Sequence, residues 1–427
     1  MIRNMYMRIF LKAAVAAAFA GTLVVASCSR NVYDEEEYKK ILKYLSPVDS
    51  IDQQHEWELC KLRTYTFTAS RNSDAVQVQV YTENPLTSKS AQMMGNTYIS
   101  AGQQAQLALS VPLARTTLYA AQVGADGRLT VTQFYSTDSK IDFSGVSNTG
   151  ESLKLSSRLA AFSYLYEESC PVPDDYDYND VVFRISQERT GEKCISVTVT
   201  LVAVGASSQL AGAIHLSGYQ KADIDSVTTD NGVTFNDGLP SSFNYYFDGH
   251  TDMLMEGRNG EAVIQLFQDA HWALYPDVEV ENGIFTRLYL NTSMSNGGDS
   301  KFVPRRSITY HVYFKSEKDL NLFTLDSLDP FVVNNYNGGF LEIHTYPYRD
   351  AQCMYNYSLP EVKDLPWALK VPYTSFRHAL EGSNLGFKRD GAMFGAYMTV
   401  GHGFGEWCED RNSALDWYLY PTRSYIY

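Results

Sequence analysis

Hydrophobic and polar side chains alternate along much of the chain. The runs at 64–68 (TYTFT) and 76–81 (VQVQVY) show this alternation, a spacing that is typical of β-strands with one buried face. Further runs of the same kind follow at 105–111, 118–120 and 129–132. The dipeptide Asp126-Gly127 separates the last two and favours a hairpin turn. The pattern predicts a small antiparallel β-domain over residues 56–145.

A longer second part begins at residue 161, after a stretch rich in Gly, Ser, Asn and Thr that we interpret as a linker (146–160). Its strand-like runs stand at 181–185, 195–201 and 308–314, and its turn signals at 230–232, 237–238 and 337–339. No regular alternation of strands with long helices is visible, which disfavours a parallel sheet. The sequence therefore predicts a mostly β chain, in which a smaller β-domain precedes an antiparallel β-sandwich over 161–427.

The first 27 residues have the pattern of a secretory signal peptide. Arg3, Arg8 and Lys12 precede an apolar run at 13–26, which is shorter than the roughly 20 residues that a membrane span needs. The sequence VASC that ends at Cys28 resembles the lipobox of bacterial lipoproteins. The resemblance implies cleavage before Cys28 and lipid attached to it, whereas the alternative is an ordinary signal peptide followed by a chance cysteine.

Residues 28–55 are predicted to form a lipidated tether with a short helix. The acidic run at 34–37 is followed by Tyr38, Ile41, Leu42 and Leu45 at helical spacing. Such a run close behind a lipidated cysteine resembles the surface-export signal of Bacteroidetes lipoproteins, although a solvated helix start explains it equally well. We expect an outer-membrane lipoprotein that is exposed at the cell surface.

The composition of the chain excludes some classes of partner and site. The formal net charge is -14, and removal of a signal that carries three basic and no acidic residues leaves about -17. Such a surface repels phosphate backbones, so nucleic acid is excluded as a partner. The 31 tyrosines suit extended strands, and they also suit platforms that bind sugars. Besides Cys28 the chain has five cysteines and no CxxC pair, so at most two disulfides can form and no zinc ribbon is indicated.

The densest group of polar side chains lies in the run DDYDYNDVVF at 174–183. In an extended backbone Asp175, Asp177 and Asn179 would aim their oxygens to one side, with Asp180 opposite unless the chain turns there. Hard cations such as calcium prefer six to eight oxygen ligands. The predicted calcium ligands are Glu167, Glu168, Asp174, Asp175, Asp177, Asn179 and Asp180. The alternative is an acidic turn whose carboxylates accept hydrogen bonds from backbone amides.

An EF-hand is excluded for this run. Counted from Asp175, the sixth position holds Asp180 instead of glycine, and the twelfth holds Ser186 instead of glutamate.

Several ordered motifs resemble the LruC domain. The first is YEESCPVPDDYDYNDVVF at 166–183, and the others are AVIQLFQDAH at 262–271, DPF at 329–331, LEIH at 341–344, LPWALKVP at 365–372 and DWY at 416–418. The resemblance covers about 162–427, and SIDQQHEW at 50–57 resembles the stretch that opens such lipoproteins. It implies a β-sandwich on secreted or surface proteins with no established reaction. Related extracellular domains with similar acidic loops are suspected calcium binders.

Two departures from the family pattern stand out. Glu167-Glu168 stands where members usually read Glu-Asp, and TYPY at 345–348 replaces the usual leucine and Pro-Thr pair. If Glu342 lines a site, the details of that site differ in this chain.

Enzyme motifs are absent from the sequence. There is no HExxH for a metalloprotease and no GxSxG for a nucleophile elbow. We expect a binding or adhesion module that is anchored to the outer membrane by its lipid and contacts a surface glycan or protein. The alternatives are an enzyme that acts on polysaccharide, because paired carboxylates are a spatial feature, and a structural component of an envelope assembly.

Overall fold

The computed structural model describes residues 46, 48, 50–153, 159–172, 175–240, 243, 245–247, 252–276, 280–281, 284–285, 287–317, 320–357, 365–386 and 401–427. These residues belong to one compact unit, Leu45–Tyr427. The predicted signal peptide, Cys28 and the acidic run at 34–37 lie outside the described residues, as does Asp174.

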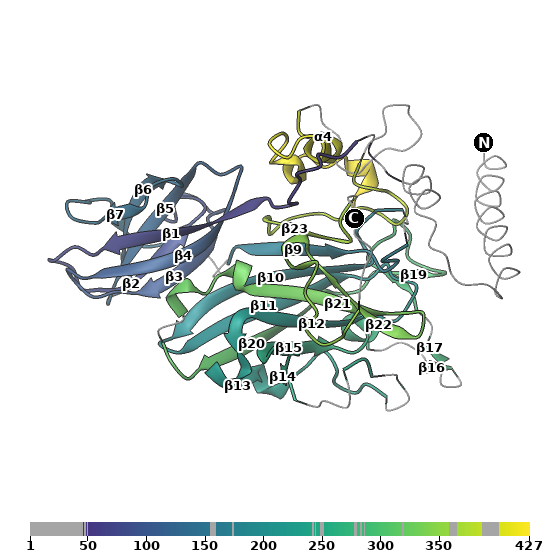
Figure 1. Ribbon diagram of the computed structural model, residues 1–427. Coiled ribbons are helices and arrows are strands. Elements are labelled where there is room, and N and C mark those ends of the chain that lie inside the picture. Colours follow the sequence, from purple (N-terminus) through teal and green to yellow (C-terminus); the bar gives the residue numbers. More distant parts are fainter. Residues whose placement is uncertain are drawn as a thin grey trace, which may run out of the picture. The chain divides into compact units, whose positions relative to one another are not determined.

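The first strands form a smaller sandwich of two sheets (Figure 1). One sheet has the order β4-β1-β7 (Gln104–Pro112, Cys60–Thr68, Lys140–Asp142). The other has the order β3-β2-β5-β6-β8 (Met93–Tyr98, Ala75–Tyr81, Thr117–Gly124, Leu129–Tyr135, Thr149–Gly150). The alternating residues of β1 and β2 supply Tyr65, Phe67, Val78 and Val80 to the shared core. Each strand thus buries one face, as its period of two predicts.

The later strands form a larger sandwich. Its first sheet has the order β13-β20-β11-β10-β9-β23 (Ile224–Thr229, Arg306–Phe314, Cys194–Ala203, Val181–Gly191, Ala161–Tyr166, Ala368–Val371). Its second sheet has the order β14-β15-β12-β21-β22 (Leu254–Glu256, Glu261–Phe267, Ala211–Gln220, Leu328–Tyr336, Gly339–His344). Neighbouring strands in both sheets are antiparallel.

The main hydrophobic core lies between these two sheets. The alternate residues Ile195, Val197, Val199 and Leu201 of β11 face it, and Ile214 and Leu216 of β12 contribute from the other sheet. Burial of such side chains is the main favourable term in folding. The predicted mostly β, sandwich fold is confirmed.

Short elements complete the described part of the chain. The remaining strands are β16 (Val280–Glu281), β17 (Ile284–Phe285), β18 (Tyr289–Leu290) and β19 (Ser300–Lys301), and the α-helices are α3 (Ala270–Leu274) and α4 (Phe404–Glu409). The 3-10 turns are Lys221–Asp223, Asp230–Gly232, Leu320–Leu322, Leu325–Ser327, Tyr346–Tyr348, Trp417–Leu419 and Arg423–Tyr425. In this part of the chain, every helix is too short or too polar to cross a membrane.

A second core covers the outer face of the first sheet of the larger sandwich. It joins Leu165 of β9 and Val182 of β10 to Trp407 of α4 and to Trp57 near the start of the described chain. His55 Nε2 lies 2.9 Å from the carbonyl oxygen of Trp407, and the rings of Trp57 and Trp407 meet edge to face at 5.4 Å. The motif at 50–57 therefore fastens the beginning of the described chain to its end.

The described cysteines form no disulfide. Cys60, Cys170, Cys194, Cys353 and Cys408 are all buried free thiols. The boundaries that the sequence predicts between the two β-domains stay a prediction, because both sandwiches fall within one compact unit.

Candidate metal site at the acidic loop

The acidic run lies in the connection between β9 and β10. These strands are antiparallel neighbours, and Tyr166 at the end of β9 pairs with Val181 at the start of β10. The two ends of the connection are therefore held together by the sheet. Glu167 and Glu168 follow β9 directly and Asp180 precedes β10, so acidic residues that are far apart in the loop meet at its base.

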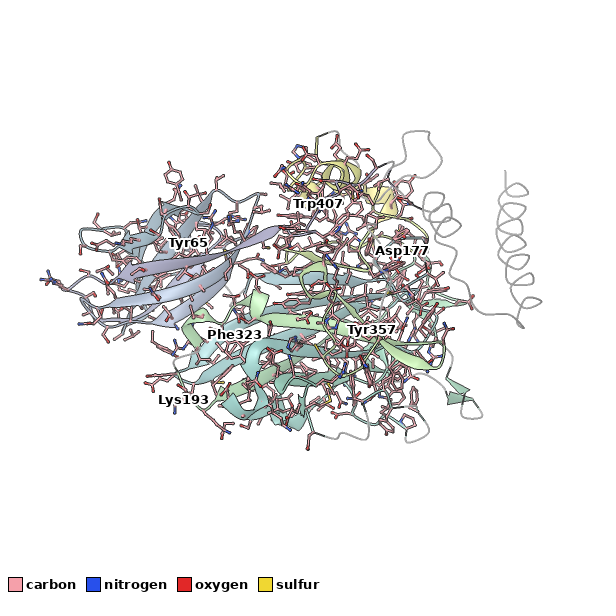
Figure 2. The ribbon with its side chains drawn as sticks, in the orientation of Figure 1. Tyr65, Asp177, Lys193, Phe323, Tyr357 and Trp407 are labelled. Atoms are coloured by element: carbon pink, nitrogen blue, oxygen red, sulfur yellow. The ribbon has the colours of Figure 1, made fainter. Side chains whose placement is uncertain are left out.

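The backbone of the loop differs from the extended one that we considered from the sequence. Tyr176 and Tyr178 have φ values of 55° and 54°, in the left-handed region. This conformation costs roughly 1–2 kcal/mol per residue. Burial of both rings in the second core offsets that cost. The two tyrosines anchor the loop, and Asp177, which Figure 2 labels, stands between them in the sequence.

Three of the predicted ligands come together. Oxygen atoms of Glu167, Asp175 and Asp177 all lie within 4.8 Å of one another. Glu167 and Asp177 are buried, with 1% and 2% of their surface exposed. Carboxylates in such a group repel one another unless protons, backbone amides or a cation compensate their charge.

Backbone amides compensate part of this charge. Asp177 accepts hydrogen bonds from the amide of Asn179 at 3.1 Å and from the amide of Gly382 at 2.8 Å. Glu167 accepts from the amide of Tyr178, and Asp180 from the amide of Glu168. These hydrogen bonds are the ones that the alternative to a metal site, an acidic turn, predicts.

Glu168 forms its hydrogen bonds with a different segment of the chain. Its carboxylate accepts hydrogen bonds from the amides of Ser207 and Ser208 at 2.6 and 2.9 Å, and from the hydroxyls of both serines. Four donors occupy its two oxygens, so Glu168 fastens the neighbouring 207–208 turn. The structure does not bring it into the group of Glu167, Asp175 and Asp177.

The protonation behaviour of the loop follows from burial. Burial, and then the charges of Asp175 and Glu167, raise the pKa of Asp177 well above its ordinary value. Burial and the charge of Glu168 likewise raise the pKa of Asp180, against a hydrogen bond from the amide of Glu168 that lowers it. Among the described residues, the largest causes of these two shifts are burial and neighbouring carboxylates.

One oxygen of the loop has no partner among the described residues. Asn179 is completely buried and its Nδ2 donates to the carbonyl of Ala379 at 3.2 Å, but its Oδ1 accepts no hydrogen bond. A Cβ atom placed on Gly205 would lie 2.0 Å from Asn179 Oδ1 and 3.0 Å from Glu381 Oε2. These two oxygens therefore face the same point. Oxygen atoms in this arrangement are suited to a hard cation.

Sequence reasoning missed two contributors to this site. Glu381 raises the pKa of both Asp177 and Asp180, and Gly205 leaves the space that Asn179 and Glu381 share. Glu381 is about 200 positions beyond the loop along the chain, and the only local signal is its place in a turn-like EGSN sequence. No spacing rule connects such a residue with the loop.

The comparisons with known proteins concern the larger sandwich and the fold. Residues 193–388, somewhat less than half of the chain, match the family model described as a domain of unknown function (DUF4842). A crystal structure of a protein from Bacteroides ovatus, described as a candidate lipoprotein, is similar with a TM-score of 0.50 and 16% identity. The alignment covers 83% of this chain and 99% of the other. No curated protein matches. The structural likeness supports the fold alone at this identity.

Proposed function

We propose that the acidic loop binds a calcium ion, and that this ion stabilises the larger sandwich of an envelope-anchored binding module. The observation that carries the proposal is Asn179 Oδ1, a fully buried acceptor without a hydrogen-bond partner among the described residues, in the same loop as the carboxylate group of Glu167, Asp175 and Asp177. A buried polar atom without a partner costs about 1–3 kcal/mol. A cation at this point would supply the missing partner for Asn179 and neutralise the carboxylates.

The donor set favours calcium over other ions. Glu167, Asp175, Asp177, Asn179 and Glu381 offer only oxygen atoms, which zinc accepts less readily than nitrogen and sulfur. Calcium tolerates irregular geometry with six to eight ligands, whereas magnesium requires a compact octahedron and retains its waters. The ligands come from a loop and from a distant turn, so an ion between them would fix both to the sandwich.

The assignment as a binding module rests on other support. The ordered motifs at 166–183, 329–331 and 341–344 resemble the LruC domain, which has no established reaction. The lipobox resemblance at Cys28 supports a place in the cell envelope. The partner that we propose is a surface glycan or protein, and the proposed location is the outer face of the outer membrane.

Calcium titration of the purified full-length chain tests the site. If calcium binds the folded state alone, it adds RT ln(1 + [Ca]/Kd) to stability, about 2.7 kcal/mol at a hundredfold excess over Kd. We expect calcium to raise Tm, chelator to lower it, and magnesium to act more weakly. Calorimetric titration should show one binding event.

Two variants locate the effect. Asp177→Ala should abolish the calcium response, whereas Asp225→Ala, which removes an exposed carboxylate of β13, should leave it intact. The same melting curve in calcium and in chelator for the unaltered chain would leave the loop as an acidic turn and end the calcium proposal.

The binding role has its own experiment. A glycan array probed with the full-length chain, with and without calcium, should show a defined set of ligands whose signal depends on the ion. Signals that are absent under both conditions would remove glycans as the ligand class, without affecting the calcium titration.

A further inference from the structure

A second group of polar side chains lies on the outer face of the second sheet of the larger sandwich. His215 of β12 stands directly opposite Asp329 of β21 in the antiparallel register. Ala213 and Phe331, two residues away on the same strands, belong to a small apolar cluster that also contains Cys353. Both His215 and Asp329 are buried, with 5% and 0% of their surface exposed. Ionisable groups in an apolar layer of this kind need partners.

The partners form a continuous series of acids and histidines. Glu261 Oε2 lies 2.8 Å from His215 Nε2, and His215 Nδ1 lies 3.2 Å from Asp329 Oδ2. The same Asp329 oxygen lies 2.9 Å from His344 Nδ1. His344 Nε2 lies 3.0 Å from Glu342 Oε2. The DPF and LEIH motifs thus supply Asp329, Glu342 and His344 to one cluster.

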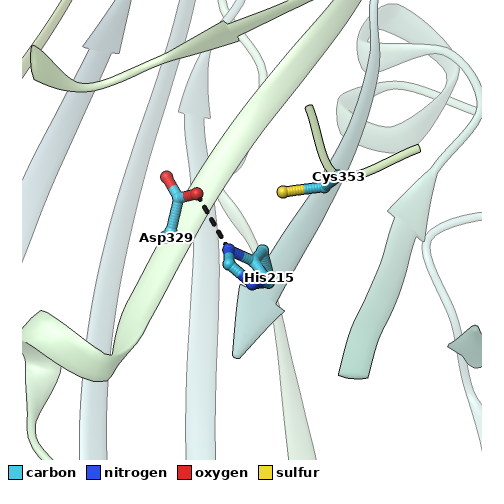
Figure 3. Close-up of side chains that lie close together, drawn as sticks. All are labelled: His215, Asp329 and Cys353. Carbon is cyan, nitrogen blue, oxygen red and sulfur yellow. Dashed lines mark hydrogen bonds and ion pairs between the residues drawn. The ribbon is translucent and has the colours of Figure 1, made fainter. Parts of the chain in front are cut away.

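A thiol completes this cluster. Cys353 follows the 3-10 turn Tyr346–Tyr348, and its own amide donates to Glu342 at 2.7 Å, which fixes the position of its segment. Atoms of His215, Asp329 and Cys353 that could hold a metal all lie within 4.8 Å of one another. Figure 3 shows the imidazole, the carboxylate and the thiol directed toward a common space. Cys353 is buried and forms no disulfide.

Two observations concern the oxygens of Asp329. Its Oδ2 contacts both His215 and His344, whereas its Oδ1 is completely buried and accepts no hydrogen bond within the described chain. In addition, the 3.2 Å between His215 Nδ1 and Asp329 Oδ2 is the longest contact of the series. Charge-assisted hydrogen bonds between nitrogen and oxygen are usually about 2.7–2.9 Å long. Two ligands that share a tetrahedral ion, each at about 2.0–2.1 Å from it, lie roughly 3.3 Å apart.

We propose that His215, Asp329 and Cys353 bind a transition-metal ion of the zinc class. Nitrogen, oxygen and sulfur donors in one set are characteristic of zinc and disfavour calcium or magnesium. His215 would use Nδ1, which leaves Nε2–H to donate to Glu261, so that a carboxylate orients the metal-binding imidazole. His344 would support Asp329 in the same way.

The second possible set around Cys353 is less suitable. Glu342, His344 and Cys353 also have atoms within 4.8 Å of one another. However, the carboxylate of Glu342 already accepts the amides of Cys353, Met354 and Tyr355 in addition to contacting His344. Both oxygens of Glu342 therefore have partners, whereas Asp329 Oδ1 has no hydrogen-bond partner among the described residues. The ion is placed with His215 and Asp329 for this reason.

Cobalt serves as the spectroscopic probe. The purified full-length chain is stripped with a chelator that prefers transition metals, calcium is kept in excess, and Co²⁺ is then titrated. We expect one equivalent to bind and a near-ultraviolet absorption band from charge transfer between sulfur and cobalt. Added Zn²⁺ should displace the cobalt and remove the band. A folded, unaltered chain that binds neither ion overturns the proposal.

Matched cysteine variants assign the band. Cys353→Ser should abolish it, whereas Cys194→Ser, at a buried cysteine of β11 away from the cluster, should keep it. Asp329→Asn should weaken cobalt binding at least tenfold while the sulfur band persists at saturation. A band that survives in folded Cys353→Ser contradicts the assignment. If Cys353→Ser does not fold, the unaltered chain and Asp329→Asn still decide it, and a missing calcium response would leave these results unchanged.

Discussion

At the scale of single residues, the burial of Asp177 makes the stability of the folded chain depend on pH. Its pKa in the folded chain is raised well above the ordinary 3.8 by burial and neighbouring carboxylates. The folded state therefore holds a proton that the unfolded state releases near pH 4. Stability without metal falls as the pH rises from about 4 through the raised pKa, because the folded state binds more protons in that window.

The direction of this pKa shift predicts a measurable dependence of stability on pH. In chelator, the unaltered chain should lose stability relative to Asp177→Asn as the pH increases from about 4 to 7.5, by about 1.4 kcal/mol for each unit of pKa shift. Calcium should reverse the trend, because it binds the deprotonated carboxylate, so its effect on Tm should grow over the same range. Urea unfolding at several pH values measures both. Parallel pH profiles for the two proteins in chelator would show that Asp177 has no raised pKa.

A substitution at Gly205 is a second test of the proposed calcium site. Alanine there would place a Cβ atom 2.0 Å from Asn179 Oδ1, so the buried amide would have to move. We expect Gly205→Ala to cost about 1–3 kcal/mol through overpacking and to remove the calcium response. Gly150→Ala is the control, because its Cβ would meet Leu86 at an ordinary 3.5 Å. A normal calcium titration in Gly205→Ala would place the ion elsewhere.

At the scale of elements, β3 and β10 are joined by a paired contact. Asn96 Nδ2 donates to the carbonyl of Arg189 at 2.9 Å, and the amide of Arg189 donates to Asn96 Oδ1 at 3.0 Å. Asn96 is buried with 4% of its surface exposed. One side chain thus links a strand of the smaller sandwich with a strand of the larger one.

Removal of this contact should weaken the whole unit. Asn96→Ala loses two hydrogen bonds of about 0.5–1.5 kcal/mol each, so the free energy of unfolding should fall by about 1–3 kcal/mol. Asn148→Ala, at an exposed side chain of the same sandwich, should change it little. Urea unfolding followed by two probes would show whether the transition stays single. An unchanged midpoint for Asn96→Ala would mean that the contact contributes nothing to stability.

The strands could be predicted from the sequence and the site only in part, for a physical reason. The runs at 64–68 and 195–201 alternate because each strand buries one face, and this local rule places them within β1 and β11. The group of Glu167, Asp175 and Asp177 could be anticipated because charge is concentrated in one loop. Glu381 could not, because only the folded chain brings it to Gly205.

The group of His215, Asp329 and Cys353 could be predicted from the sequence even less. His215 and Cys353 lie in none of the sequence motifs quoted above, and Asp329 belongs to the DPF motif at 329–331 without a predicted role. Their proximity arises from the register between β12 and β21 and from the segment that covers that sheet. Pairing of strands distant in sequence has no local signature. Cluster chemistry of this kind therefore becomes visible only after the sheets are assembled.

At the scale of the whole molecule, the proposed attachment to the envelope depends on Cys28. This residue lies outside the described residues, and the prediction rests on the VASC sequence and the preceding basic and apolar stretch. Lipid contributes about 0.8 kcal/mol per buried CH₂, and stable anchoring takes more than one chain. A processed lipoprotein would carry its chains at the new amino terminus.

Cys28→Ser should block lipidation and processing of the protein. Expressed in a bacterial host that processes lipoproteins, the unaltered chain should be cleaved before position 28 and carry lipid there, whereas the variant should carry no lipid and keep its signal, and intact-mass measurement distinguishes the two. Cys60→Ser, at a buried cysteine of β1, is the control and should be processed and lipidated normally. The calcium response of Cys28→Ser should match that of the unaltered chain, because the acidic loop belongs to the unit Leu45–Tyr427. If the variant is still cleaved and carries lipid, the anchor is not the lipid on Cys28.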